Sequence, residues 1–91
     1  MSEVTSQDIL SRASALKKNK ESDYSSDNIK ESDYFLFGDI SYIQMLHMKM
    51  LRIRSVSQQE KINYESLTDS LLDMINYAAM YAAWIENSPH E

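Results

Sequence analysis

Three acidic side chains, Glu65, Asp69 and Asp73, recur at helical spacing in one stretch of the sequence. At about 100° per residue, these acids and Asn76 fall within roughly 80° of arc on one helix face. Like charges four residues apart destabilise a helix slightly, so a compensating interaction is expected. Mg²⁺ would supply it, because Mg²⁺ binds carboxylate oxygens and completes its shell with water and phosphate oxygens. We therefore predict Asp69 and Asp73 as metal ligands, with Glu65 as an auxiliary acid; Asn76 would orient the ligand.

Two alternatives to a metal ion stay open for this acidic face. In the first, Lys49 and Arg52 on the preceding segment are the basic partners of the acids. In the second, acids near a helix N-terminus interact favourably with the helix dipole. The dipole accounts for Glu65 and Asp69 but accounts poorly for Asp73, which lies in the third turn.

The acidic face is expected on the best-defined helix of the chain, residues 64–86. Apolar residues recur on the other side of this helix, in a stripe predicted to face the core: Leu67, Leu71, Met74, Ala78, Ala82 and Ile85. A second helix is predicted over residues 39–56, after Gly38, with Asp39 as its cap. Its central apolar stripe comprises Ile43, Leu46, Met50 and Ile53.

The rest of the chain divides around these two helices. Residues 1–17 are predicted to hold an N-terminal helix, because Thr5 and Asp8 have the spacing of a capping box. Residues 18–38 are predicted to be a polar connecting loop, and residues 39–87 the helical core of a single domain. The chain has one Gly and one Pro, too few for the turns of a multistranded sheet, so an all-α fold is predicted.

Composition also limits the classes of function. The net charge of −5 argues against nonspecific binding to nucleic acid, which needs a basic surface. The chain has no Cys, so disulfides and thiolate metal sites are excluded. No apolar run reaches the length of a membrane span, and the first residues lack the pattern of a secretory signal. A soluble, cytoplasmic protein is expected.

Two segments, HMKMLRI and SLTDSLLDMINYAAMYAAW, carry a resemblance to a known family. The chain resembles small phage and prophage proteins of the MazG-like type, which include a domain described as nucleotide modification-associated. These proteins have a Lys and an Arg about three residues apart on one helix, followed by Asp-x-x-x-Asp-x-x-Asn/Gly-Tyr-Ala on the next. The matching positions are Lys49, Arg52, Asp69, Asp73, Asn76, Tyr77 and Ala78.

The resemblance implies a three- to four-helix MazG-like bundle completed by homo-oligomerisation. MazG-like proteins cleave nucleoside triphosphates with Mg²⁺, which is held by Glu-x-x-Glu on one helix and Glu-x-x-Asp on the next. This chain lacks the first motif, and Ser70 replaces the Glu of the second. The resemblance thus implies a nucleotide bound with Mg²⁺, with Lys49 and Arg52 meeting its phosphates, and it leaves hydrolysis open. For a phage-encoded protein, the compartment would be the host cytoplasm.

The pentapeptide KESDY occurs twice, at residues 20–24 and 30–34. Proteins of this type often carry Asp-Tyr-Gly between their first two helices, and the first copy provides Asp23 and Tyr24 without the glycine. The resemblance therefore implies that Tyr24 stacks on a base. The alternative is a polar linker that became self-similar by chance.

Apolar residues exceed one stripe on both long helices. Three helices cannot hide the surplus, and leaving it exposed would create a patch of the size that marks interaction sites. We predict a homodimer, or a dimer of dimers, between the C-terminal half of the helix at 64–86 and the helix at 39–56. The predicted interface anchors are Tyr77, Met80, Tyr81 and Trp84.

A function of another class is also open. The chain would then be a non-catalytic helical module that binds and modulates a host protein. Its acidic surface would meet a basic partner by charge complementarity.

Overall fold

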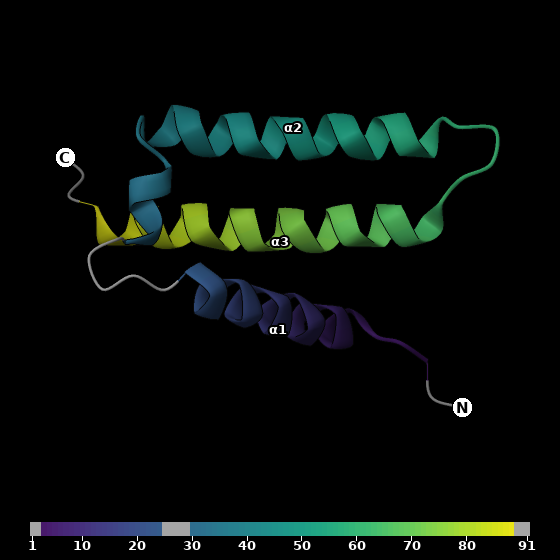
Figure 1. Ribbon diagram of the computed structural model, residues 1–91, viewed down its shortest axis with the longest axis horizontal. Coiled ribbons are helices and arrows are strands. Elements are labelled where there is room, and N and C mark those ends of the chain that lie inside the picture. Colours follow the sequence, from purple (N-terminus) through teal and green to yellow (C-terminus); the bar gives the residue numbers. More distant parts are fainter. Residues whose placement is uncertain (1–2, 25–29, 89–91) are drawn as a thin grey trace.

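The computed structural model describes residues 3–24 and 30–88, and this part of the chain is helical, with no strand. The elements are α1 (Ser6–Tyr24), a short 3₁₀ helix η1 (Glu31–Tyr34), α2 (Asp39–Ser57) and α3 (Tyr64–Asn87) (Figure 1). The predicted all-α fold is confirmed. None of the helices in the described part is long and apolar enough to cross a membrane.

Helix α1 begins as expected but ends later than expected. The Thr5 backbone N–H donates to Asp8 at 2.9 Å, and the Asp8 N–H donates back to the Thr5 hydroxyl at 3.2 Å, which forms the predicted capping box. The helix continues past residue 17 to Tyr24, through the first KESDY copy. The reason is that this stretch contains no Gly or Pro to stop a helix.

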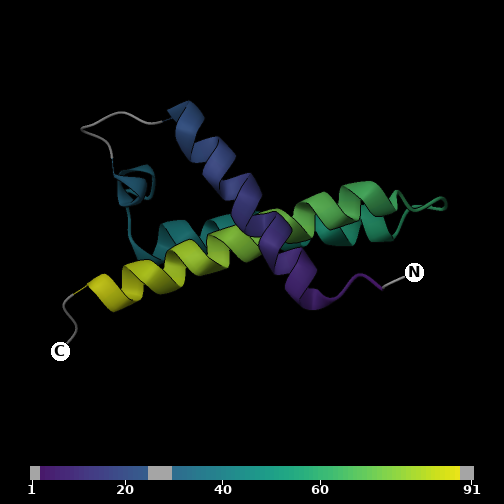
Figure 2. The same ribbon diagram turned by 90° about the horizontal axis from the view of Figure 1, so that it is seen from below.

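The three helices form an open layer, with α3 in the middle. Helix α2 runs antiparallel to α3 on one side, and α1 lies against the other side (Figure 1). Seen from below, α1 crosses α3 obliquely near its middle, while α2 follows α3 along its length (Figure 2). Since α2 packs against a single long helix, most of its circumference is open to solvent.

The centre of the fold is an aromatic cluster around Tyr42, which is 1% exposed. Its ring stacks on Phe35 at a centroid distance of 4.0 Å and on Tyr81 at 5.1 Å. Trp84 lies beside it at 5.6 Å. The Tyr81 hydroxyl donates to Asp39 at 2.7 Å, which ties the end of α3 to the start of α2.

The predicted apolar stripes face the core only in part. The members of the stripes that are half-buried are Leu46 and Ile53 on α2 and Leu67 and Met74 on α3. On α2, Ile43 and Met50 are exposed, and α3 is met instead by the face that holds Tyr42 and Lys49. The residues of the predicted α3 stripe that are exposed are Leu71, Ala78, Ala82 and Ile85. The face with larger rings faces inward, because aromatic side chains bury more apolar area than alanines.

The predicted interface anchors lie, half-buried, within the chain. Tyr81 and Trp84 belong to the Tyr42 cluster, and Tyr77 meets Phe35 edge-on at 6.3 Å. Tyr77, Met80, Tyr81 and Trp84 are all of intermediate exposure. Oligomerisation stays a prediction. The predicted interface required these side chains to be exposed on a single chain, and they are half-buried within it.

Gly38 makes the turn between η1 and α2 and brings it against Trp84. Its φ of 61° and ψ of −128° lie in a region that L residues rarely adopt. A Cβ at this position would lie 3.2 Å from two atoms of the Trp84 ring.

We expect Gly38→Ala to destabilise the fold by about 2 kcal/mol, from backbone strain together with displacement of Trp84. Urea unfolding followed by circular dichroism measures this loss. Ser55→Ala, at an exposed position of α2, is the control and should change the free energy of unfolding by less than about 0.5 kcal/mol. Equal stability of the two variants would contradict the strained turn.

The Tyr42 hydroxyl is buried and has no hydrogen-bond partner in the described part of the chain. Burial and the negative charge of Glu31 raise the pKa of Tyr42 above its ordinary value of 10.0. The hydrogen bond to Asp39 raises the pKa of Tyr81 as well. In the unfolded chain both tyrosines lose their protons at a lower pH, so alkaline conditions favour unfolding.

We expect Tyr42→Phe to stabilise the protein by about 1 kcal/mol at neutral pH, because it removes an unsatisfied buried hydroxyl. The stability of the wild type should fall as the pH rises above about 10, and the fall should be shallower in the variant. Urea titrations between pH 7 and 11 measure both effects. A variant less stable than the wild type at pH 7 would show that the hydroxyl has a partner.

Candidate functional site

Four polar side chains meet where α2 and α3 run side by side, and we call this set the α2–α3 strip. It consists of Lys49 and Arg52 on α2, and Ser70 and Asp73 on α3. The Lys49 Nζ donates to Asp73 Oδ2 at 3.1 Å, and each side chain is 23% exposed. The Arg52 Nε donates to the Ser70 hydroxyl at 3.2 Å, and Ser70 is buried. The ion pair with Lys49 therefore accounts for Asp73, the acid that the helix dipole leaves without a compensating interaction.

Lys49 is held from two sides. Its ammonium lies 5.8 Å from the centroid of the Tyr77 ring, within the range of a cation–π interaction. The Tyr77 ring in turn packs edge-on against the buried Phe35. Arg52 differs in that it donates to Ser70 and is exposed to solvent. The strip thus presents one fixed cation and one cation with a solvent-facing guanidinium.

Asn76 joins α3 to α1. Its amide Nδ2 donates to the Ala13 carbonyl at 3.0 Å, and Ala13 is 1% exposed. A small residue at position 13 lets α1 approach α3 closely enough for this bond. Asn76 was predicted to orient a ligand, and the structure shows that it holds a neighbouring helix.

The structure does not bring the predicted metal ligands together. Glu65 and Asp69 are exposed, and the described residues include no group of three or more His, Asp or Glu that could hold a metal ion. Asp73 already faces the Lys49 ammonium, whose positive charge disfavours a cation at that oxygen. The donor set therefore does not fit an Mg²⁺ site made by the protein alone.

The helix dipole accounts for Glu65. Asn63 caps α3, since its side chain accepts a hydrogen bond from the Ser66 N–H at 3.0 Å, and Glu65 lies in the first turn. The dipole favours an acid at this position without any ligand. The helix dipole thus explains the position of Glu65 without a ligand, and its role as an auxiliary acid stays a prediction.

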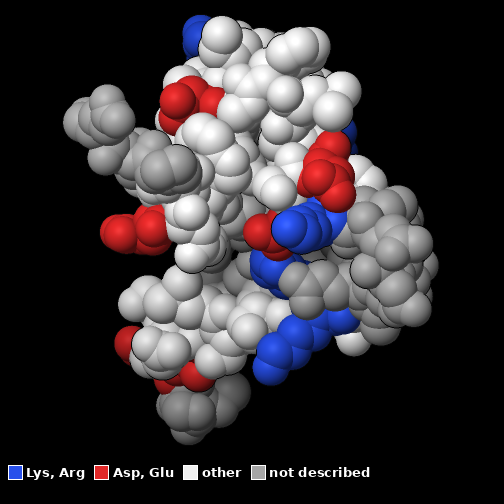
Figure 3. Space-filling model, turned by 90° about the vertical axis from the view of Figure 1, so that its left-hand side faces the viewer, with Lys and Arg blue, Asp and Glu red and all other residues white. Residues whose placement is uncertain are grey.

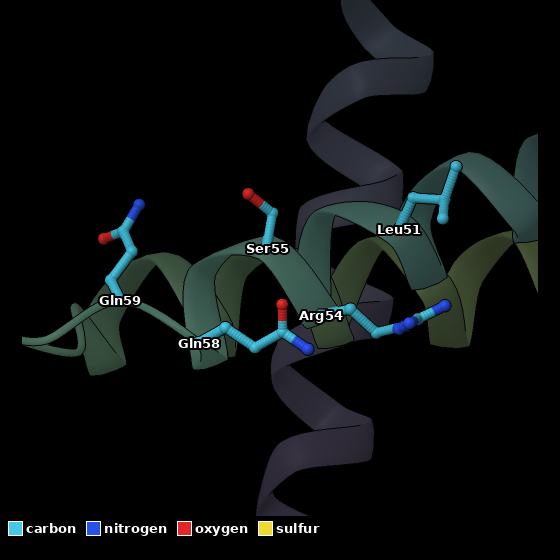
Figure 4. A pocket seen from close by; sticks show the side chains of 5 residues that line it. All are labelled: Leu51, Arg54, Ser55, Gln58 and Gln59. Carbon is cyan, nitrogen blue, oxygen red and sulfur yellow. The ribbon is translucent and has the colours of Figure 1, made fainter.

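Two hollows of the surface lie away from the strip. One of about 340 Å³ lies at the C-terminal end of α2, and Figure 4 shows its side chains spread apart instead of converging. These side chains are Leu51, Arg54, Ser55, Gln58 and Gln59. A second, of about 390 Å³, lies along α1 and includes Leu10 and Lys18. Neither hollow includes a residue of the strip.

A second ion pair lies near η1. Lys17 on α1 and Glu31 on η1 approach to 2.8 Å and link the two elements. Figure 3 shows that basic and acidic side chains touch on this end of the molecule, among mostly uncharged surface. Tyr24 ends α1, but its side chain lies outside the part that the structure describes, so base stacking by Tyr24 stays a prediction.

Ser70 is the residue of the strip that sequence reasoning does not recognise as a partner. The sequence marks it only as a replacement for a glutamate. The signal that could have found it is its spacing. Ser70 belongs to a row of positions on α3 that face α2 and that follow one another at intervals of three or four residues. These positions are Ser70, Asp73, Tyr77, Tyr81 and Trp84.

Comparison with known proteins gives one family. The model of the family described as nucleotide modification associated domain 1 matches residues 20–85, more than half of the chain. This range contains η1, α2, nearly all of α3 and every residue of the strip. Neither the curated proteins nor the solved structures include a match.

We expect a double-mutant cycle of Lys49→Met and Asp73→Leu to give a coupling energy of about 1 kcal/mol, because the pair is mostly shielded from water. The same cycle on the more exposed pair Lys17–Glu31, with Lys17→Met and Glu31→Leu, is the control and should give less. Chemical unfolding of each single and double variant measures both values. A larger coupling for the exposed pair would contradict this ranking.

Proposed function

The chain belongs to the family of nucleotide modification associated domain 1, and on this basis we propose that it binds a nucleotide through its phosphate groups on the α2–α3 strip. The observation that carries the proposal is the pair of cations on one side of α2. Lys49 and Arg52 are three residues apart and are each fastened to α3, by Asp73 and Ser70. Cations held in place lose little conformational freedom when a ligand binds.

Each cation has a distinct part in the proposal. The guanidinium of Arg52 is exposed and planar, and such a group donates two parallel hydrogen bonds to a phosphate. Lys49 acts as a point charge one turn away, and Asp73 holds its ammonium in position. Because the Lys49 charge is already shared with Asp73, Arg52 supplies the larger part of the attraction.

Mg²⁺ enters the proposal only as the counter-ion of the nucleotide. Mg²⁺ bound to phosphates needs just one or two protein carboxylates. Asp69 is exposed and lies one turn before Asp73, so it is the acid of the predicted set that is available to such an ion. Hydrolysis is not part of the proposal, because the three predicted carboxylates do not form a common site.

Several finer expectations stay predictions. These are the relation to MazG-like pyrophosphohydrolases, a phage origin, a cytoplasmic location and a basic host protein as partner. None of the described contacts tests them.

We expect Arg52→Gln to weaken the binding of a nucleoside triphosphate at least 10-fold, since a hydrogen bond to a charged group contributes about 1.5–3 kcal/mol. Isothermal titration with and without Mg²⁺ measures the change. Arg54→Gln is the matched control, because Arg54 is also an exposed arginine of α2 but is not part of the strip. Binding should also strengthen from the monophosphate to the triphosphate.

Two results would overturn the proposal. The first is the absence of heat with every nucleoside triphosphate, with or without Mg²⁺. The second is an equal loss of affinity in Arg52→Gln and Arg54→Gln, which would indicate nonspecific attraction to surface charge.

A further inference from the structure

The three most exposed large apolar side chains among the described residues lie where η1 joins α2. They are Leu36, Phe37 and Ile40, which are 81%, 76% and 72% exposed. Tyr34, at the end of η1, is 60% exposed. These four side chains fall within seven consecutive residues, and we call them the apolar end. Figure 3 views the molecule from this end and shows mostly uncharged surface there.

The backbone that carries the apolar end is held in place by the chain itself. The Phe35 N–H donates to the Ser32 carbonyl at 3.1 Å, and the Gly38 N–H donates to the Phe35 carbonyl at 3.3 Å. The Phe37 N–H donates to the Ser41 hydroxyl at 2.9 Å. Because the segment is fixed before any partner arrives, binding there loses little affinity to the ordering of the backbone.

The fold does not need apolar side chains at these exposed positions. Phe35 supplies the buried contact of the segment, since it is 7% exposed and stacks on Tyr42. Polar side chains at positions 36, 37 and 40 would leave that contact in place. Large apolar side chains that are exposed together mark surfaces that bind other molecules.

Acidic side chains flank the apolar end. Residues 31–40 contain no Lys or Arg and three acids, Glu31, Asp33 and Asp39. The first of these acids pairs with Lys17. Asp33 accepts a hydrogen bond from the Lys30 backbone N–H at 2.8 Å, and Asp39 accepts one from the Tyr81 hydroxyl. Both donors are uncharged, so no cation in the described part of the chain is paired with either of these two carboxylates.

We infer that the apolar end binds a segment of another protein in which large apolar side chains are flanked by lysine or arginine. The apolar side chains of that segment cover the four exposed ones, and its cations meet Asp33 and Asp39. The apolar contact supplies the buried area, and the acids set the orientation of the partner. The inference thus differs from a general attraction of a basic protein to the acidic surface of the chain.

The charges also favour this partner over two others. A second copy of the chain would bring its own Asp33 and Asp39 against those of the first, and like charges at an interface disfavour the contact. A membrane surface that contains anionic lipids would repel the same two carboxylates.

The apolar end is separate from the α2–α3 strip. Lys49 lies nine residues after Ile40 on α2, a distance of about 13 Å along the helix. Arg52 lies about 18 Å from Ile40 by the same rise. The inference therefore does not depend on the proposed nucleotide binding, and either one can fail without the other.

A labelled synthetic peptide of leucine and lysine at helical spacing is the probe, and fluorescence anisotropy measures its affinity. We expect Phe37→Ser to weaken binding at least about 10-fold, because the partner loses an apolar side chain to cover. Met48→Ser is the matched control, since Met48 is 53% exposed on α2 but is not part of the apolar end. Both variants should keep the helical circular dichroism of the wild type.

A second comparison tests the acids. A peptide with glutamate in place of every lysine should bind at least about 10-fold more weakly. Asp33→Asn keeps an oxygen that can accept the Lys30 N–H and should weaken binding of the lysine peptide about 2- to 5-fold. Glu60→Gln is the control, because Glu60 is an exposed acid in the connection between α2 and α3, at the opposite end of the molecule (Figure 1).

The inference fails if the lysine peptide does not bind, or if it binds Phe37→Ser and Met48→Ser equally well. Equal affinity for the lysine and glutamate peptides would also overturn it, because the choice of partner rests on charge. A smaller mass of Phe37→Ser than of the wild type in light scattering would show a second copy at the apolar end instead. Binding to phosphatidylcholine vesicles that Phe37→Ser abolishes would show a lipid surface instead.

Discussion

The stacking of Tyr42 between Phe35 and Tyr81 is the interaction on which the rest of the structure depends. It joins the segment before α2, the first turn of α2 and the last turns of α3. Lys49 lies seven residues, or two turns, after Tyr42 and therefore on the same face of α2. The stack and the Lys49–Asp73 pair together fix how far α2 is advanced along α3. The α2–α3 strip exists only in that register, because Arg52 meets Ser70 one turn further along.

Helix α3 is unusual in that its inward faces carry polar groups. Ser70, Asp73 and Asn76 each bond to another helix, the first two to α2 and the third to α1. Polar groups that are satisfied in this way add little to stability, because their desolvation offsets much of the attraction. They do penalise every other alignment of the helices, in which they would be buried without partners. The arrangement of the layer is thus set by hydrogen bonds, while the aromatic cluster supplies two of the four buried hydrophobic residues in the described part of the chain, Phe35 and Tyr42.

The helices were largely predictable from the sequence, whereas the orientation of their faces was not. The scarcity of Gly and Pro indicated helices, the Thr5–Asp8 box located the start of α1, and Gly38 marked the start of α2. Periodicity found two apolar stripes, but it placed all of their residues toward the core, and many of them are exposed. A helix with apolar side chains on more than one face gives no signal for which face another helix covers. The choice depends on tertiary contacts between residues far apart in the sequence, such as Tyr42 with Tyr81.

The candidate site was predictable in part for the same reason. Spacing identified Lys49 and Arg52 as a basic pair and Asp73 as an acid in need of a partner, and the structure joins Lys49 to Asp73. Spacing could not show that Glu65 and Asp69 are exposed while Asp73 meets Lys49, because residues on one helix face need not meet the same neighbour. Asn76 shows the limit most clearly. Its partner is the carbonyl of Ala13, and a backbone atom leaves no mark in the sequence.

The attachment of α1 has a consequence for local stability. Helix α1 meets α3 around Ala13, the Asn76 amide supplies a bond, and the Lys17–Glu31 pair links α1 to η1. Ala13 is the one fully buried residue among the described side chains of α1, so α1 should open at a lower free energy than the aromatic cluster and its amides should exchange with solvent first. When α1 leaves, Asn76 is released, and Asn76 lies one turn after Asp73 of the strip. A ligand that binds the strip more tightly when α1 is packed on α3 therefore shifts the equilibrium of α1 toward its packed state. The free energy of packing α1 on α3 then contributes to the affinity of the ligand.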